Sequence, residues 1–120
     1  MRAAARVGFA LLAAVTLYLF LTPAPPQGGP EGADTVVHAV LFAGLAVLGR
    51  GAGWRPLPLG PALVAYAAVT EGLQATLPLG RDGDLVDLAA DTVGVLLGLG
   101  VVVVLSRARR AAPYPSRRRG

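Results

Sequence analysis

Four long apolar runs, separated by short stretches rich in polar residues, glycine and proline, dominate the pattern of this chain. The runs cover residues 7–22, 35–49, 58–77 and 85–105. A helix needs about 20 apolar residues to cross the hydrocarbon core of a bilayer. The second run is short, but it becomes long enough if Asp34 and His38 lie at one membrane boundary and Arg50 extends to the other. The pattern therefore predicts an all-α membrane bundle of four transmembrane helices.

The first run has a second interpretation. Arg2 and Arg6 before it and the small residue Ala24 after it fit a secretory signal peptide. Pro25, however, would directly follow the cut, where proline is poorly tolerated, and the run is closer to spanning length than to a typical signal core. We therefore favour a retained helix over a cleaved signal peptide.

Composition supports the membrane assignment. Of the 120 residues, 54% are hydrophobic and only 15% are charged, and the mean hydropathy is +0.60. Soluble domains carry roughly a quarter charged residues, so a soluble enzyme of ordinary composition is excluded. The length allows one membrane domain, residues 1–106, and an Arg-rich cytoplasmic tail, residues 107–120, which we expect to be disordered. The absence of cysteine excludes disulfides, thiolate metal sites and cysteine nucleophiles.

Arginine is distributed unevenly between alternate ends of the four runs. The chain has 11 basic residues, all of them arginine, and only Arg81 falls on one of the two sides. The other ten of the 11 fall on the opposite side: Arg2, Arg6, Arg50, Arg55, Arg107, Arg109, Arg110, Arg117, Arg118 and Arg119. Because arginine and lysine concentrate on the cytoplasmic side of membrane proteins, this asymmetry predicts four spans with both termini in the cytoplasm.

The net charge of +4 and the pI of about 10.7 raise the question of a nucleic-acid partner. The arginines lie at the ends of apolar segments rather than among stacking aromatic residues, so membrane lipids are the expected partners and nucleic acid is not. Trp54, next to Arg55, and Tyr18 with Phe20 at the other end of the first helix are typical of interfacial aromatic anchors.

The acidic residues show the reverse asymmetry, since all of them lie on the outer side. Loops or helix ends carry Glu31, Asp34, Asp82 and Asp84, and the outer halves of helices carry Glu71, Asp87 and Asp91. Residues three or four positions apart share a helix face. This spacing gives three polar pairs: Asp34 with His38, Glu71 with Gln74, and Asp87 with Asp91. The pairs enter from the same side, so we expect them to meet in one polar layer.

Several of these residues also have a purely structural interpretation. Asp34 and Asp84 are typical of helix N-caps, and Asp87 would complete a capping box with Asp84. Gln74 could hydrogen-bond a neighbouring helix, and His38 could be a packing residue whose ring nitrogens have hydrogen-bond partners. The sequence alone leaves these alternatives open.

Glu71 and Asp91 are harder to explain as structural residues. With a rise of about 1.5 Å per residue they lie roughly 10 Å inward from the outer helix ends. A carboxylate at that depth costs free energy and normally faces a partner or a water-filled cavity. On the fourth helix, Asp87, Asp91, Gly94 and Gly98 form one stripe, in which carboxylates precede small residues suited to close helix approach. We therefore expect the acids to face the interior of the bundle and favour a functional role or an obligatory pairing.

Charge balance constrains this layer further. Negative charge comes from four acids: Asp34, Glu71, Asp87 and Asp91. Arg81 and a protonated His38 supply at most two positive charges, so some acids must be protonated or a cation must join them. Arg81 lies in the tight outer turn, where it could fold over the layer or bind an anionic headgroup through its planar fork.

Searches for established motifs mostly fail. Residues 82–84 begin like an EF-hand loop, but Asp87 replaces the turn glycine and Val93 replaces the closing glutamate. The sequence has no phosphate-binding glycine loop, no paired zinc histidines and no serine-nucleophile motif. We therefore expect no cofactor, and the pattern leaves open whether a metal or a proton balances the acids.

Taken in order, these residues resemble the VanZ-like family of small bacterial membrane proteins, over about residues 10–105. That family shows an acid four residues before a histidine, then E-x-x-Q, an outer turn with arginine, and an acid opening a last helix that ends in glycines. The matching residues are Asp34 with His38, Glu71 with Gln74, Arg81, and Asp87 to Asp91 followed by Gly94 and Gly98. Thr35 stands where the family commonly has lysine, and Asp91 where it commonly has asparagine. These departures remove a cation and add an anion, which makes the layer more dependent on protons or cations.

The resemblance implies a multi-pass protein of the bacterial plasma membrane, in the context of glycopeptide (teicoplanin-type) tolerance, and it implies no particular reaction. Under one hypothesis the polar layer binds a lipid headgroup, a cation or an envelope-active ligand. Under the other, the protein is a small membrane enzyme acting on a lipid-linked envelope substrate, with Glu71 or Asp91 and His38 exchanging protons. The residues expected to form the site are Asp34, His38, Glu71, Gln74, Arg81, Asp87 and Asp91.

Overall fold

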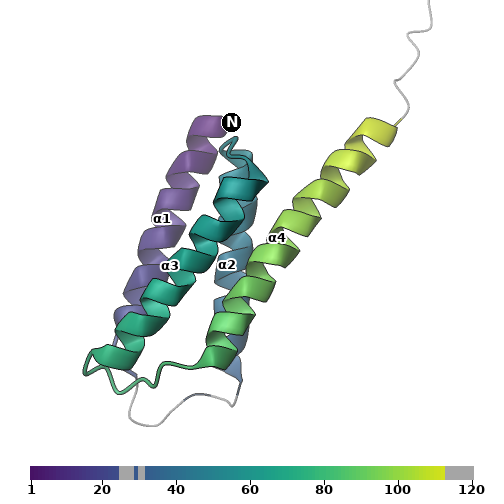
Figure 1. Ribbon diagram of the computed structural model, residues 1–120. Helices are drawn as coiled ribbons and strands as arrows, with labels where there is room; N and C mark the ends of the chain where they lie inside the picture. Colours follow the sequence, from purple (N-terminus) through teal and green to yellow (C-terminus); the bar gives the residue numbers. More distant parts are fainter. Residues whose placement is uncertain (25–28, 30–31, 113–120) are drawn as a thin grey trace, which may run out of the picture.

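The computed structural model describes residues 1–24, 29 and 32–112 of the chain. Within these residues the chain forms four helices: α1 (Arg2–Leu21), α2 (Ala33–Gly51), α3 (Pro56–Thr76) and α4 (Leu85–Ala111). Successive helices run in opposite directions, so the ends of α1 and α3 lie on the same side of the bundle as the starts of α2 and α4 (Figure 1). The prediction of an all-α bundle of four helices is confirmed.

Three of the four helices in the described residues, α1, α2 and α4, are long and apolar enough to cross a membrane. The exception, α3, has 21 residues, so its composition rather than its length sets it apart. Pro56, Pro58 and Pro61 lie in its first half, and Glu71 and Gln74 lie in its last two turns. The fold is that expected of a membrane protein, and the crossing by α3 stays a prediction.

The distribution of side chains is the reverse of that in a water-soluble bundle. Large apolar residues on every helix are exposed, among them Leu11, Val40, Leu57, Leu96 and Leu97. The buried polar or charged residues are Thr16, His38, Thr70, Glu71, Gln74 and Asp91. Water-soluble monomers rarely expose large continuous apolar surfaces. This arrangement suits a bundle whose outside faces lipid and whose polar groups face one another.

All four helices extend beyond the apolar runs that predicted them, α1 and α4 by the most residues. α1 begins at Arg2 rather than Val7, and α4 continues past Leu105 to Ala111. A helix satisfies its own backbone hydrogen bonds, so it can carry charged residues beyond an apolar run without interruption. The first part of the Arg-rich tail is therefore helical, and residues 113–120 lie outside the described residues.

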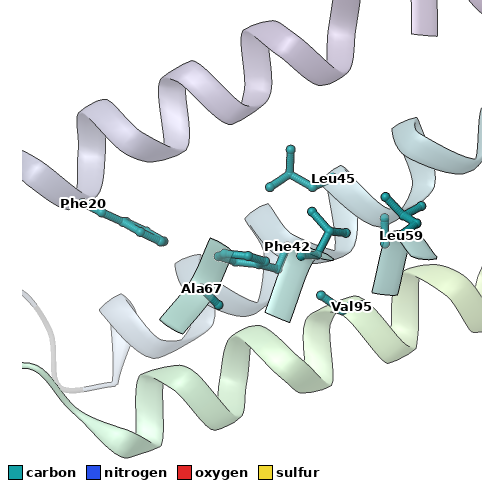
Figure 2. Close-up of a cluster of buried hydrophobic side chains, with 8 residues drawn as sticks. Phe20, Phe42, Leu45, Leu59, Ala67 and Val95 are labelled. Carbon is teal, nitrogen blue, oxygen red and sulfur yellow. The ribbon is translucent and has the colours of Figure 1, made fainter. Parts of the chain in front are cut away.

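The apolar core is small and is shared by all four helices. Figure 2 shows it with labels on Phe20, Phe42, Leu45, Leu59, Ala67 and Val95. The expectation that Phe20 is an interfacial anchor is wrong, because its side chain is only 2% exposed, whereas that of Tyr18 is 72% exposed. Phe20 lies four residues after the buried Thr16 and therefore shares the inward face of α1.

The closest helix approach is between α2 and α4, and two glycines make it possible. A Cβ atom added to Gly94 would collide with the carbonyl oxygen of Ala39, and one added to Gly98 would lie 2.5 Å from the carbonyl oxygen of Ala43. Small residues at such positions let two helix backbones approach closely. Of the predicted inward stripe, Asp91, Gly94 and Gly98 are buried and Asp87 is half-buried, so the inward direction of the stripe is confirmed from Asp91 onward.

The alternating helix directions give the bundle two chemically different ends. The polar end holds Leu21, Ala33, Thr76 and Leu85, which are the helix boundaries nearest the acidic residues. The arginine end is the opposite one. Among the described residues, Arg81 is the only arginine at the polar end, and the arginine end carries Arg2, Arg6, Arg50, Arg55, Arg107, Arg109 and Arg110.

Candidate functional site

Three buried polar residues from three helices meet near the polar end. We call His38 of α2, Glu71 of α3 and Asp91 of α4 the inner triad. His38 and Asp91 are 0% exposed and Glu71 is 7% exposed. The Nδ1 atom of His38 lies 3.0 Å from Oδ1 of Asp91. Each residue offers one nitrogen or oxygen atom such that the three atoms lie within 4.8 Å of one another.

The remaining helix, α1, covers the histidine of the triad. The ring of Phe20 stacks on the imidazole of His38, with 3.9 Å between ring centroids and 11° between ring planes. The carbonyl oxygen of Phe20 accepts a hydrogen bond of 3.1 Å from Nε2 of Gln74. Gln74 therefore joins α3 to α1 and positions the aromatic cover, and its amide nitrogen binds the backbone rather than the acids.

Glu71 connects the inner triad to the start of α4. Its Oε1 atom accepts a hydrogen bond from the backbone N–H of Asp84, which is the N-cap residue of α4. The N-cap prediction for Asp84 is confirmed, because its side chain accepts a hydrogen bond of 2.8 Å from the backbone N–H of Val86. The capping box with Asp87 is wrong, because Glu71 from the neighbouring helix occupies the N–H that Asp87 would bind.

Asp87 has a different partner, on α2. Its Oδ1 atom accepts a hydrogen bond of 2.7 Å from the hydroxyl of Thr35. Asp34, His38 and Asp87 also offer one ligand atom each within 4.8 Å, and we call them the outer triad. Asp34 is exposed, Asp87 is half-buried and His38 is fully buried, so the outer triad leads from the surface to the inner triad.

The N-cap prediction for Asp34 is wrong. Gly32 holds the cap position of α2 with a φ of 76°, a left-handed conformation that glycine adopts without steric cost. The carboxylate of Asp34 instead pairs with Nη1 of Arg81 at 3.2 Å. Nε of the same arginine donates a hydrogen bond of 2.9 Å to the carbonyl oxygen of Thr22. Arg81 thus joins the end of α1 to the start of α2 across the polar end.

The ion pairs formed by the described residues leave the inner triad with two carboxyl groups and one group that can be positive. Arg81 pairs with Asp34 at the surface, so the positive partner inside is the imidazole of His38 alone. With both carboxylates ionised the sum is negative even when the imidazole is protonated, and a proton or a cation must balance it. Three buried atoms of the triad have no hydrogen-bond partner among the described residues: Nε2 of His38, Oε2 of Glu71 and Oδ2 of Asp91.

Such atoms are costly unless something satisfies them. A buried polar group without a hydrogen bond costs about 1–3 kcal/mol, and a buried charge costs more. Native proteins satisfy the large majority of buried polar atoms. Protons, hydrogen-bond donors or a cation would satisfy these atoms.

Most of the predicted site residues come together, in two adjoining groups. His38, Glu71 and Asp91 form the inner triad, and Asp34 and Asp87 complete the outer one with His38. Arg81 and Gln74 support these groups through backbone carbonyls of α1. Of the other acids, Asp82 is exposed and Glu31 lies outside the described residues.

Two contributors to the site do not follow from the pattern of polar pairs. Thr35, a departure from the family pattern, binds Asp87. Phe20, predicted to lie at the membrane interface, covers His38. The spacing of four between Thr16 and Phe20 was the available signal, because a polar residue inside an apolar run marks the inward face of a membrane helix.

Two apolar grooves lie elsewhere on the bundle. One, of about 630 Å³, lies between α1 and α3 and is lined by Phe9, Trp54 and Tyr66 among others. The other, of about 570 Å³, lies between α3 and α4. Neither contains a member of the two triads, so the polar site is separate from the surface grooves.

Comparisons with models of protein families, with curated proteins and with solved structures find no match to this chain. The resemblance to the VanZ-like family thus depends on the ordered residues alone and stays a prediction.

Proposed function

We propose that the chain is a VanZ-like protein of the bacterial plasma membrane that binds a positively charged group at its polar end and so contributes to glycopeptide (teicoplanin-type) tolerance. The positive group is a free cation, or the ammonium of a lipid headgroup or envelope-active ligand. All of these ligands are positively charged. The ammonium group also offers hydrogen-bond donors, and the free cation offers open coordination positions.

The membrane placement is supported by three features. Three helices suit a membrane crossing, the outside of the bundle is apolar, and arginine is concentrated at one end. Because α3 begins at the arginine end and ends at the polar end, its 21 residues span about 30 Å, the thickness of the hydrocarbon core. We therefore propose four crossings, with the arginine end and both termini in the cytoplasm and the polar end outside.

The observation that carries the binding proposal is the inner triad. Glu71 and Asp91 place two carboxylates against the single imidazole of His38, and each of the three residues keeps one buried atom without a partner in the described part of the chain. An anionic headgroup would add to this excess of negative charge. A positive group would compensate this charge. The sign of the charge therefore favours a positive ligand over an anionic headgroup.

A second candidate function is acid–base catalysis on a lipid-linked envelope substrate. The observation in its favour is the pair of His38 and Asp91, since a carboxylate on one ring nitrogen orients an imidazole and supports its action as a base at the other. The complete burial of both side chains favours the binding of a small positive group over catalysis, because a lipid-linked substrate would need direct access to the imidazole.

The test compares Glu71→Gln with wild type in a bacterial host that lacks the gene. We expect Glu71→Gln to insert and fold but to lose teicoplanin tolerance, because the amide keeps the shape of the side chain and removes its charge. Asp82→Asn, an exposed acid outside both triads, is the matched control and should keep full tolerance. A stable and fully tolerant Glu71→Gln strain would overturn the proposed function.

A further inference from the structure

We propose that the inner triad binds one divalent transition-metal ion, for which Zn²⁺ is the reference. This inference rests on the proposed function, since it names the positive group that the polar end binds. His38, Glu71 and Asp91 supply one imidazole nitrogen and two carboxylate oxygens from three different helices. Imidazole nitrogens and carboxylate oxygens are both zinc ligands, and zinc sites with three protein ligands leave the fourth position to water or another ligand.

The distances allow such a site. Ligand atoms at about 2.0–2.2 Å from a tetrahedral Zn²⁺ lie about 3.4 Å from one another. Nδ1 of His38 and Oδ1 of Asp91 are 3.0 Å apart as a hydrogen-bonded pair, and an ion bound by both atoms would release the proton between them to solvent. The three ligand atoms of the triad lie within 4.8 Å, so the ion needs a closure of at most about 1.4 Å.

Charge and burial select a divalent ion. With a neutral imidazole and both carboxylates ionised the triad carries two negative charges, which one divalent ion cancels and a monovalent ion does not. Among the described residues each member of the triad also keeps an unpartnered buried atom, and all three side chains are at least nine-tenths buried. A single ion balances both carboxylates at once, whereas a bulky ammonium headgroup would have to displace the Phe20 ring that stacks on His38.

The ligand types select the metal further. Ca²⁺ takes 6–8 oxygen ligands and Mg²⁺ usually keeps several waters, and neither demand fits a small site that includes a nitrogen ligand. Imidazole with carboxylates suits Zn²⁺, Mn²⁺ or Fe²⁺. We therefore expect Zn²⁺ and Mn²⁺ to bind and Ca²⁺ and Mg²⁺ to bind at least tenfold more weakly.

The outer triad provides the route of entry. Asp34 is exposed and Asp87 is half-buried, and both offer ligand atoms within 4.8 Å of one on His38. His38 belongs to both triads, so an ion that displaces Arg81 from Asp34 can pass inward through a ligand common to both groups. The path begins at the polar end, where the acids are concentrated.

The experiment uses the full chain without an affinity tag, purified in detergent and stripped with EDTA. Titration calorimetry with ZnCl₂ should show one ion per chain, and X-ray absorption should show nitrogen and oxygen ligands. Asp91→Asn and Glu71→Gln should each raise the Kd for Zn²⁺ at least tenfold, while Asp82→Asn should leave it within twofold of wild type. Absence of stoichiometric Zn²⁺ and Mn²⁺ binding to wild type, or equal affinity in all three variants, would overturn the inference.

This result separates the metal site from the envelope function. If wild type binds no metal but Glu71→Gln loses tolerance, the metal inference fails and the binding of another positive group stands. If metal binds as expected but Glu71→Gln keeps tolerance, the metal site stands and the proposed function fails.

Discussion

Gly94 of α4 packs against the carbonyl oxygen of Ala39 of α2, the residue that follows His38. Asp91 lies one helical turn before Gly94, so the approach of the two backbones brings its carboxylate to the imidazole of His38, at 3.0 Å. Without a side chain at position 94 the two helices approach closely enough for this short pair. The same α2–α4 contact therefore packs the two helices together and forms the His38–Asp91 pair of the site.

The first prediction tests this contact. We expect Gly98→Leu to lower the yield and thermal stability of the folded protein, because its side chain would meet the carbonyl oxygen of Ala43. Overpacking of a tight contact costs about 1–3 kcal/mol or more. Gly100→Leu is the matched control, since a Cβ atom there meets nothing within 4 Å. Equal detergent unfolding temperatures for the two variants would contradict the inward orientation of the stripe.

The second prediction concerns the aromatic cover of the site. Phe20→Ala should destabilise the protein by about 3 kcal/mol, since it removes a large buried side chain and the stacking on His38. Tyr18→Ala, two residues away on the exposed face of the same helix, should change stability little. Chemical unfolding of both variants measures the difference. A silent Phe20→Ala would mean that α1 does not close over His38.

Much of the fold follows from the sequence because lipid imposes simple rules. The lengths of the apolar runs predict the four helices, and the positions of arginine distinguish the two ends of the bundle. The stripe from Asp91 to Gly98 also gives the inward face of α4. These features repeat along one helix, so periodicity is sufficient to find them.

The partners of the site residues could not be predicted in the same way. Glu71 binds the backbone of Asp84, and Arg81 pairs with Asp34. Such contacts depend on the relative rotation and depth of separate helices, which spacing within one helix does not determine. The failed N-cap prediction for Asp34 has the same cause, because the loop places Gly32 at the cap.

The third prediction tests the orientation in the membrane. The chain has no cysteine, so single cysteines report their own position. Asp82→Cys, exposed at the polar end, should react with an impermeant thiol reagent outside intact cells, and Ala112→Cys, exposed at the arginine end, should not. These positions avoid Gly83, where a side chain would meet Ala75. Reaction of Ala112→Cys from outside would contradict the four-span topology.

The fourth prediction tests the excess negative charge of the inner triad in EDTA-treated protein. Asp91→Asn should be as stable as wild type or more stable, because the amide can still bond His38 while one uncompensated charge is removed. His38→Ala leaves two buried carboxylates without their positive partner and should cost about 3–5 kcal/mol. Thermal unfolding of both variants measures this contrast. Equal destabilisation by both would show that the triad is electrically balanced without a further cation.

The last prediction concerns Arg81, which contacts two helices through two different nitrogens. Nε donates to the carbonyl oxygen of Thr22 and Nη1 pairs with Asp34. A lysine has one nitrogen on a flexible stem and cannot keep both contacts in this geometry. Arg81→Lys should therefore loosen the polar end and reduce teicoplanin tolerance, while global stability falls by no more than about 1 kcal/mol because the ion pair is partly exposed.

Arg107→Lys, on the exposed part of α4 at the arginine end, is the control for the loss of a guanidinium and should keep full tolerance. Asp34→Asn provides the second arm, because it removes the ion pair while leaving the Thr22 contact in place. If the geometry at Thr22 matters as well as the charge, Arg81→Lys will lower tolerance more than Asp34→Asn does. If tolerance is unchanged in Arg81→Lys, the bridge between α1 and α2 serves folding alone, and the proposed binding function depends on the buried residues beneath it.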